Sequence, residues 1–146
     1  MFLESRGQTT LAQQVLTYAD SAFALSGRTI VKSSNSSTYN ETYTASGPFS
    51  GFEPYLGTGA PTVLWTEGSA EMLLTQADLG QSTTALTNSL NAIAAVTPND
   101  APVQADQVQV NSTYGEAYDV WPAAAAGAWL MLAEHKPTPL LFVPVD

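Results

Sequence analysis

The chain of 146 residues contains no cysteine and only four basic residues, against 13 acidic ones, which gives a formal net charge of −9. The absence of cysteine excludes disulfides, thiol catalysis and thiolate metal sites. The shortage of Lys and Arg argues against nucleic acid and membranes as partners, because anionic surfaces are bound through several basic side chains. Neutral polar ligands such as saccharides are compatible with this charge.

Histidine is equally scarce, since His135 is the single one in the chain. One histidine without cysteine cannot build a His-rich metal site or a Ser-His-Asp triad, so we predict no metal and no cofactor. Its position after the last predicted helix is typical of a cation that complements the helix dipole. The first residues also lack the basic and then apolar pattern of a signal peptide. The compartment stays undecided, with a secreted or periplasmic location expected of a longer parent protein.

Apolar residues recur at spacings of three and four in four segments, which predict helices at about 9–25, 63–79, 83–96 and 121–134. The second and third are separated by a Gly-containing turn and should form an antiparallel hairpin. Short β-favouring runs occur at 28–32, 38–45 and 102–110, and a loop rich in Gly, Pro and aromatic residues spans 47–61. We predict a mainly α fold of antiparallel helical hairpins with long decorated loops, in which these runs either form short β segments or stay extended. The chain would be a single domain over 1–146 or a fragment of a larger helical assembly.

The last predicted helix differs from the others in having no polar face. Residues 123–133 are all apolar or glycine, so neighbouring elements should enclose this helix. Pro122 suits its first turn, because the fixed φ of proline is compatible with a helix start. If the chain by itself leaves this helix uncovered, self-association or a missing partner is expected, since soluble monomers rarely expose large apolar patches.

Two segments, VLWTEGSAEMLL at 63–74 and YGEAYDVWPAAAAGAWLMLA at 114–133, resemble the closing hairpins of the six-hairpin, or (α/α)6 toroid, glycosidase-like superfamily. The likeness consists of a W-x-E-G-[ST]-A-x-M helix start, a hairpin, an extended loop and a final aromatic-Pro-Ala-rich helix, as in uncharacterised bacterial members. The resemblance implies a carbohydrate-active helical barrel with two catalytic carboxylates at its mouth, which often inverts the anomeric centre. Four helices would form only part of such a toroid.

Three acidic residues are candidates for catalysis at this expected site. Glu67 begins a helix beside Trp65, where its carboxylate either acts as a general acid or base or complements the helix dipole. Glu71 follows on the same helical face, and we expect a structural role for it. Glu116 and Asp119 precede the final helix within an aromatic cluster, where each is either catalytic, a hydrogen-bonding group for the sugar or part of the loop structure.

The position of Glu116 is loosely similar to the last catalytic segment of family 9 glycoside hydrolases, in which a Glu precedes the final inner helix. Gly115 stands where that segment has Asn, so the match is incomplete. If Glu67 and Glu116 form a catalytic pair, their separation would select inversion at about 6.5–9.5 Å or retention at about 5–5.5 Å.

Five aromatic side chains are candidates for stacking on sugar rings, although aromatic residues beside helix starts also serve in packing. They are Trp65, Trp121, Tyr114, Tyr118 and Tyr55.

The sequence is compatible with three functions. The first is a possible glycoside hydrolase that acts on a neutral poly- or oligosaccharide by carboxylate acid/base catalysis. The second is a non-catalytic module that binds a saccharide or a protein through the aromatic loop 49–55. The third is an inactive structural fragment. The expected partners are a neutral saccharide and either further copies of the chain or the remainder of a larger barrel.

Overall fold

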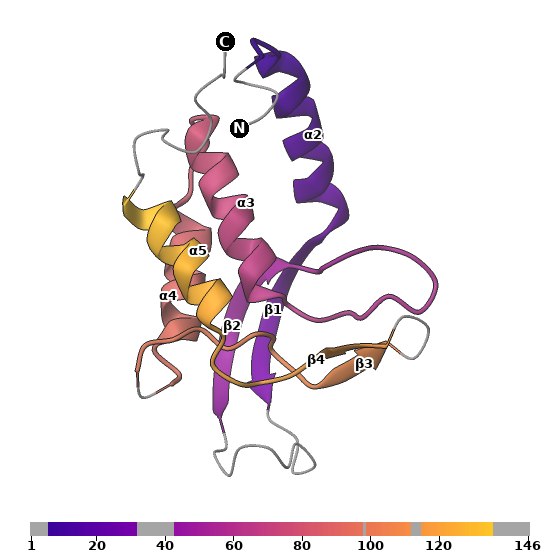
Figure 1. Cartoon of the computed structure of the whole chain (residues 1–146), viewed down its shortest axis with the longest axis vertical. Helices are drawn as coiled ribbons and strands as arrows, with labels where there is room; N and C mark the ends of the chain where they lie inside the picture. Colours follow the sequence, from indigo (N-terminus) through magenta and orange to yellow (C-terminus); the bar gives the residue numbers. More distant parts are fainter. Residues whose placement is uncertain (1–5, 32–42, 98, 112–114, 136–146) are drawn as a thin grey trace.

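The computed structural model describes residues 6–31, 43–97, 99–111 and 115–135, and these ranges mix helices with strands (Figure 1). The helices are α2 (Thr9–Ala22), α3 (Thr66–Asp78), α4 (Thr84–Ala94) and α5 (Ala124–His135). The strands β1 (Ala24–Val31) and β2 (Thr44–Phe52) form one antiparallel pair, and β3 (Gln109–Asn111) and β4 (Glu116–Tyr118) form another. The expectation of a mainly α fold, built as a partial toroid, is therefore wrong: the described chain is an α/β mixture.

The β1–β2 hairpin was only partly predicted from the sequence, because the β-favouring run 28–32 overlaps β1 but the run 38–45 reaches only the start of β2. Gly47, Pro48 and Gly51 lie within β2 and are residues that usually mark loops. Gly51 is required by packing, because a Cβ at this position would lie 2.6 Å from the Ser69 hydroxyl and 2.8 Å from Cγ of Leu64. Its backbone can therefore approach α3 closely. The strand register runs from Ala24↔Phe52 to Val31↔Thr44, and β1 displaces the predicted end of the first helix.

The helix predicted from 63 begins later, at Thr66, because the preceding residues form an extended segment. Val63 and Leu64 are fully buried there. The N–H of Leu64 donates to Oδ1 of Asp106 at 2.8 Å, and the N–H of Trp65 donates to the C=O of Phe52 at 2.9 Å. These long-range partners hold the segment extended against its local helical pattern.

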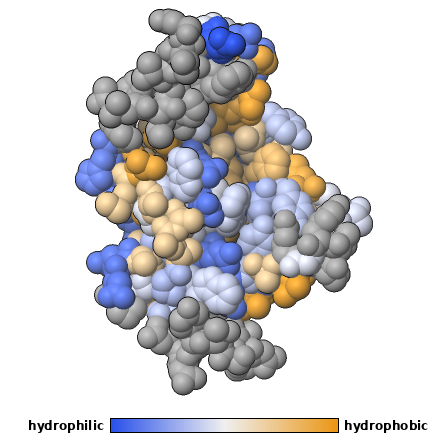
Figure 2. Space-filling model, viewed as in Figure 1, coloured by the Kyte–Doolittle hydropathy of each residue, from blue (hydrophilic) through white to orange (hydrophobic). Residues whose placement is uncertain are grey.

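Among the described residues, helix α5 is covered on one side only, which differs from the expected enclosure. Its buried residues are Ala126, Leu130 and Ala133, and it lies beside α3 and α4 (Figure 1). Met131 is 62% exposed, and a pale-orange, moderately hydrophobic surface covers α5 on the left of Figure 2. Within the described ranges, no helix combines the length and apolar character needed to span a bilayer.

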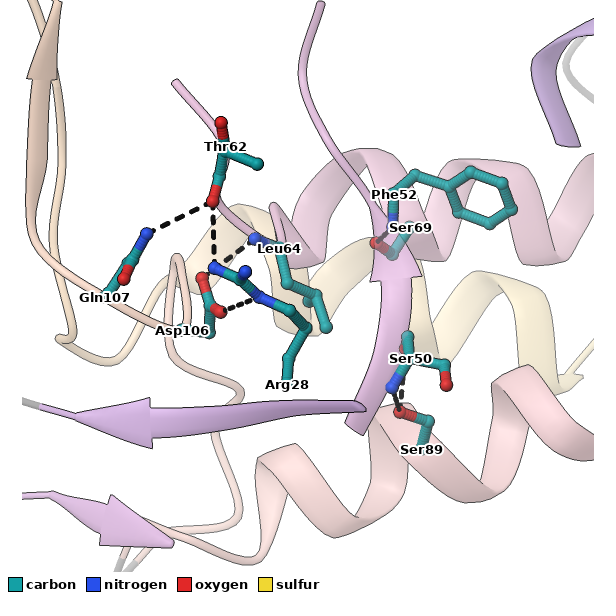
Figure 3. Close-up of polar contacts among 9 residues, drawn as sticks. All are labelled: Arg28, Ser50, Phe52, Thr62, Leu64, Ser69, Ser89, Asp106 and Gln107. Atoms are coloured by element: carbon teal, nitrogen blue, oxygen red, sulfur yellow. Dashed lines mark hydrogen bonds and ion pairs between the residues drawn. The ribbon is translucent and has the colours of Figure 1, made fainter. Parts of the chain in front are cut away.

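The hydrophobic core lies between the β1–β2 hairpin and helices α3, α4 and α5. Two buried serines attach β2 to these helices (Figure 3). The Ser69 hydroxyl of α3 accepts the N–H of Phe52 at 2.9 Å. The Ser89 hydroxyl of α4 accepts the N–H of Ser50 at 2.7 Å and donates to the C=O of the same residue at 2.7 Å. The hairpin is thus fixed on the helices by polar contacts as well as by apolar burial.

Candidate functional site

The segments that lead into α3 and α5 lie on either side of Gln104. The N–H of Thr66 donates to the C=O of Gln104 at 3.0 Å, and the N–H of Gln104 donates to the C=O of Trp121 at 2.8 Å. Trp65 also pairs antiparallel with Ala105. Helices α3 and α5 therefore begin close together, near the middle of the molecule (Figure 1). The backbones of the two candidate tryptophans are separated by a single extended segment.

Asp119 is buried within this arrangement. Its Oδ1 accepts the N–H of Val120 at 2.7 Å, and its own N–H donates to Oε1 of Gln104 at 2.9 Å. Its C=O accepts the N–H of Ala105 at 3.1 Å. These bonds hold the entry to α5 against the neighbouring segment, which is a positioning role.

A second buried carboxylate, Asp106, joins three parts of the chain (Figure 3). Its Oδ2 lies 2.5 Å from Nε of Arg28 in β1, and its Oδ1 accepts the N–H of Leu64. Arg28 also donates from Nη2 to the C=O of Thr62 at 2.8 Å, and the Gln107 side chain donates to the same oxygen at 3.1 Å. Asp106 therefore serves the fold, and the described residues contain no cluster of three potential metal ligands.

The ring of Trp65 packs against the first turn of α3. A Cβ at Gly68 would overlap with the six-membered part of this ring, so the ring lies directly over the glycine. Gly68 is buried, and Trp65 is half-buried. The glycine of the W-x-E-G motif therefore leaves the space that the Trp65 ring occupies.

Beside Trp65 lies an open cleft of about 270 Å³ between α2, the end of β2 and α3. Its lining combines aromatic and apolar residues with two carboxylates, and none of the described residues that line it is basic. The lining consists of Ala19, Phe23, Phe52, Glu53, Pro54, Trp65, Gly68, Glu71, Met72 and Thr75. Aromatic walls with a few polar groups are typical of small-ligand sites.

Glu71 is the carboxylate of this cleft whose protonation is perturbed. Burial raises its pKa above the ordinary value of 4.5, and the negative charge of Glu67 raises the pKa further. Both causes favour the neutral acid. A carboxyl group of raised pKa beside an aromatic ring is able to donate a proton to a bound ligand.

The other predicted site residues are distributed as follows. Glu67 lies half-buried in the first turn of α3, outside the cleft lining, and acts on Glu71 through its charge. The backbone of Glu116 lies in β4, opposite Asn111, and its side chain is outside the description. Because the Glu116 side chain is not described, its pairing with Glu67 stays a prediction. Tyr114 also lies outside the described residues.

The remaining aromatic candidates are not part of the cleft lining. Tyr118 is half-buried at the end of β4, and Tyr55 is half-buried after β2, next to Pro54 of the cleft. Trp121 is half-buried at the entry to α5. The structure therefore brings Trp65 together with Glu53 and Glu71, which were not among the predicted catalytic residues.

A sequence signal for the cleft does exist. Trp65, Gly68, Met72 and Thr75 follow one another at steps of three and four, with Glu71 beside them, which describes one face of a helix. Reading this face would have favoured Glu71 over Glu67. Glu53 has no comparable signal, because only the β1–β2 hairpin brings it to α3.

No family model, curated protein or solved structure matches the chain. The functional argument therefore depends on the residues of the cleft.

Proposed function

We propose that the chain is a glycoside hydrolase-like module that acts on a neutral saccharide in the Trp65 cleft, with Glu71 as proton donor. The observation that carries this proposal is a carboxyl group of raised pKa that shares a concave site with a half-buried tryptophan. The absence of basic residues from the described lining favours an uncharged ligand over a uronic acid or a sulfated sugar. At about 270 Å³, the cleft is slightly smaller than the pockets of about 300–1,000 Å³ that bind drug-sized ligands, which suits a ligand of about one sugar ring.

The residues suggest a direct assignment of roles in hydrolysis. Trp65 stacks on the apolar face of the ring. The neutral carboxyl of Glu71 donates its proton to the glycosidic oxygen as the bond from that oxygen to the anomeric carbon breaks. The Glu53 carboxylate takes a proton from a water molecule, whose oxygen bonds to the anomeric carbon. The step consumes one water, and the two protons end on the leaving group and on Glu53.

The anomer of the released sugar shows whether hydrolysis proceeds with inversion or with retention. Inversion corresponds to a separation of about 6.5–9.5 Å between the two carboxyl groups, whereas retention corresponds to about 5–5.5 Å and makes Glu53 the nucleophile. NMR of the product during the first turnovers distinguishes the two anomers.

A non-catalytic saccharide-binding module is the second candidate, and it would use the same cleft. This candidate differs from the predicted one in its binding surface. Phe49 and Phe52, in the aromatic loop predicted for binding, are buried core residues. The Phe49 side chain is therefore not available at the surface, and the cleft beside Trp65 offers the aromatic wall instead.

The test is a reducing-end assay on a panel of neutral oligosaccharides, combined with calorimetric binding. Glu71→Gln should lower kcat about 10²–10⁴-fold while binding persists, as expected on removal of a general acid. Glu53→Gln should also abolish turnover. Glu134→Gln, which changes an exposed acid on α5, serves as the matched control and should retain full activity.

The outcomes separate the candidates. Binding without turnover, lost in Trp65→Leu but kept in Glu71→Gln, would replace hydrolysis with the non-catalytic module. Absence of both binding and turnover on the whole panel would refute a saccharide function.

A further inference from the structure

The Trp65 cleft collects negative charge from three elements. Glu53, which follows β2, and Glu71, on α3, belong to its lining. At its margin, Asp20 of α2 accepts a hydrogen bond from Gln76 of α3 at 2.9 Å. A cleft lined by charge of one sign concentrates ions of the opposite sign. The electrostatics of this site therefore favour a cation.

The described lining of the cleft holds no countercharge, because none of its residues is basic. Arg28 is used elsewhere, in the ion pair with Asp106 and in a hydrogen bond to the C=O of Thr62. Burial, and after it the negative charge of Glu67, raise the pKa of Glu71. A cation bound beside Glu71 would supply the missing positive charge and would favour the ionised carboxylate.

Aromatic rings form the apolar part of the same cleft. Trp65, Phe23 and Phe52 all belong to the lining. Trp65 and Phe23 are half-buried, and the Phe23 ring makes an edge-to-face contact with Tyr18 at a centroid distance of 6.3 Å. The face of an aromatic ring attracts an organic cation, and tryptophan does so most strongly. Quaternary ammonium ligands are recognised in this way.

The wall also distinguishes between kinds of cation. A metal ion requires several oxygen, nitrogen or sulfur ligands, and the described residues contain no cluster of three potential metal ligands. An alkylated ammonium ion can use both parts of the lining, because its carbon atoms contact the rings while its charge faces the carboxylates. The composition of the cleft therefore favours the organic ion.

We propose that the Trp65 cleft binds a small organic ammonium ion, which lies against the Trp65 ring and is neutralised by Glu53 and Glu71. This ligand class differs from the neutral saccharide, and its binding does not depend on hydrolysis. Both ligands would occupy the same ring, so the ammonium ion should displace a bound saccharide.

Isothermal titration calorimetry of the whole chain with choline tests the proposal. The neutral probe of the same shape is 3,3-dimethylbutan-1-ol, which should bind at least about tenfold more weakly because it lacks the charge. Choline affinity should fall with added salt, which screens the carboxylates. It should also fall as the pH drops through the raised pKa of Glu71, because protonation removes a negative charge. Equal affinity for the two probes, or no choline binding up to about 100 mM, would refute the proposal.

Variants locate the binding in the cleft. Trp65→Leu should weaken choline binding about tenfold, and Trp65→Phe, which keeps a ring, should retain more of the affinity. Glu53→Gln should weaken it as well, and Glu71→Gln should both weaken it and reduce its pH dependence. Glu134→Gln removes the same charge from an exposed position on α5 and should bind choline as wild type does.

The control variant also provides a contrary outcome. If Glu134→Gln weakens choline binding as much as Glu53→Gln does, the attraction comes from the net charge of the chain and the cleft assignment is wrong. Circular dichroism checks the fold of each variant, and if Trp65→Leu is unfolded, the two glutamate variants decide. The saccharide panel is a separate measurement: a chain that binds choline and no saccharide would support this inference and refute the saccharide function.

Discussion

The carboxylate of Asp106 lies 2.5 Å from Nε of Arg28, a contact between residues 78 positions apart in the chain. Asp106 is 2% exposed, and its second oxygen receives the N–H of Leu64. One side chain thus connects β1, the segment before α3 and the segment beside Gln104. These same segments hold Trp65 and the cleft in place, so the site depends on the pairing of buried Asp106 with half-buried Arg28.

Asp106→Asn should destabilise the protein by about 1–3 kcal/mol, because the amide cannot form the charge-assisted hydrogen bond with the half-buried Arg28. Urea unfolding followed by far-UV circular dichroism measures this change. Asp100→Asn is the matched control, since Asp100 is exposed, and its effect should stay within about 0.5 kcal/mol. Equal stability of the two variants would show that the Arg28 contact contributes nothing.

Two glycine-to-alanine changes should have opposite signs. At Gly68 the added methyl would overlap with the Trp65 ring, which should cost about 1–3 kcal/mol as overpacking. At Gly127, within α5, the nearest atom would be Cδ of Pro102 at an ordinary 3.6 Å. That change should therefore stabilise the protein by about 0.5–1 kcal/mol through helix propensity. Thermal unfolding of both variants checks the pair, and a stabilised Gly68→Ala would refute the placement of the ring.

The pKa of Glu71 predicts a pH dependence of stability. Burial and the charge of Glu67 raise this pKa above 4.5 in the folded chain. The contribution of the neutral carboxyl is therefore fully present below pH 4.5 and is lost as the pH rises through the raised pKa. Glu71→Gln, which cannot ionise, should have a higher Tm than wild type at neutral pH, and the difference should shrink in acid. A Tm difference independent of pH would contradict the raised pKa.

Glu67→Gln tests the electrostatic link between the two acids of α3. Removing the charge of Glu67 removes the second cause of the raised Glu71 pKa. Under the proposed hydrolysis, activity requires neutral Glu71 and falls as the pH rises through that pKa. The alkaline limb of the pH–rate profile should therefore move to lower pH in Glu67→Gln. An unchanged limb together with lost activity would assign Glu67 a direct catalytic part instead.

Sequence reasoning was most successful where structure is local. The spacing of Leu86, Leu90 and Ile93 indicates a helix, and α4 buries these residues. His135, which was expected just after the last predicted helix, is instead the final residue of α5. For a helix such as α4, the pattern repeats within one or two turns, so a single stretch of sequence contains the information.

The failures concern contacts between distant segments. In the sequence Gly51 is typical of a loop, but in the structure it lies in a strand and packs closely against Ser69 and Leu64. Trp65 and Glu67 were read as one unit, but the indole lies over Gly68 and lines the cleft together with Glu71, whereas Glu67 is outside the lining. No residue near Asp106 in the sequence indicates that its carboxylate pairs with Arg28.

The amino-acid sequence by itself determined the acidic charge, the absence of thiol chemistry and the four helical segments, because composition and short-range periodicity suffice for these. Tertiary structure decided the strand β2, the extended entry to α3 and the meeting of Glu53, Glu71 and Trp65 in one cleft. The physical reason is that burial and long-range hydrogen bonds exist only after distant segments have met, and they then override the loop preferences of Pro48 and Gly51 in β2.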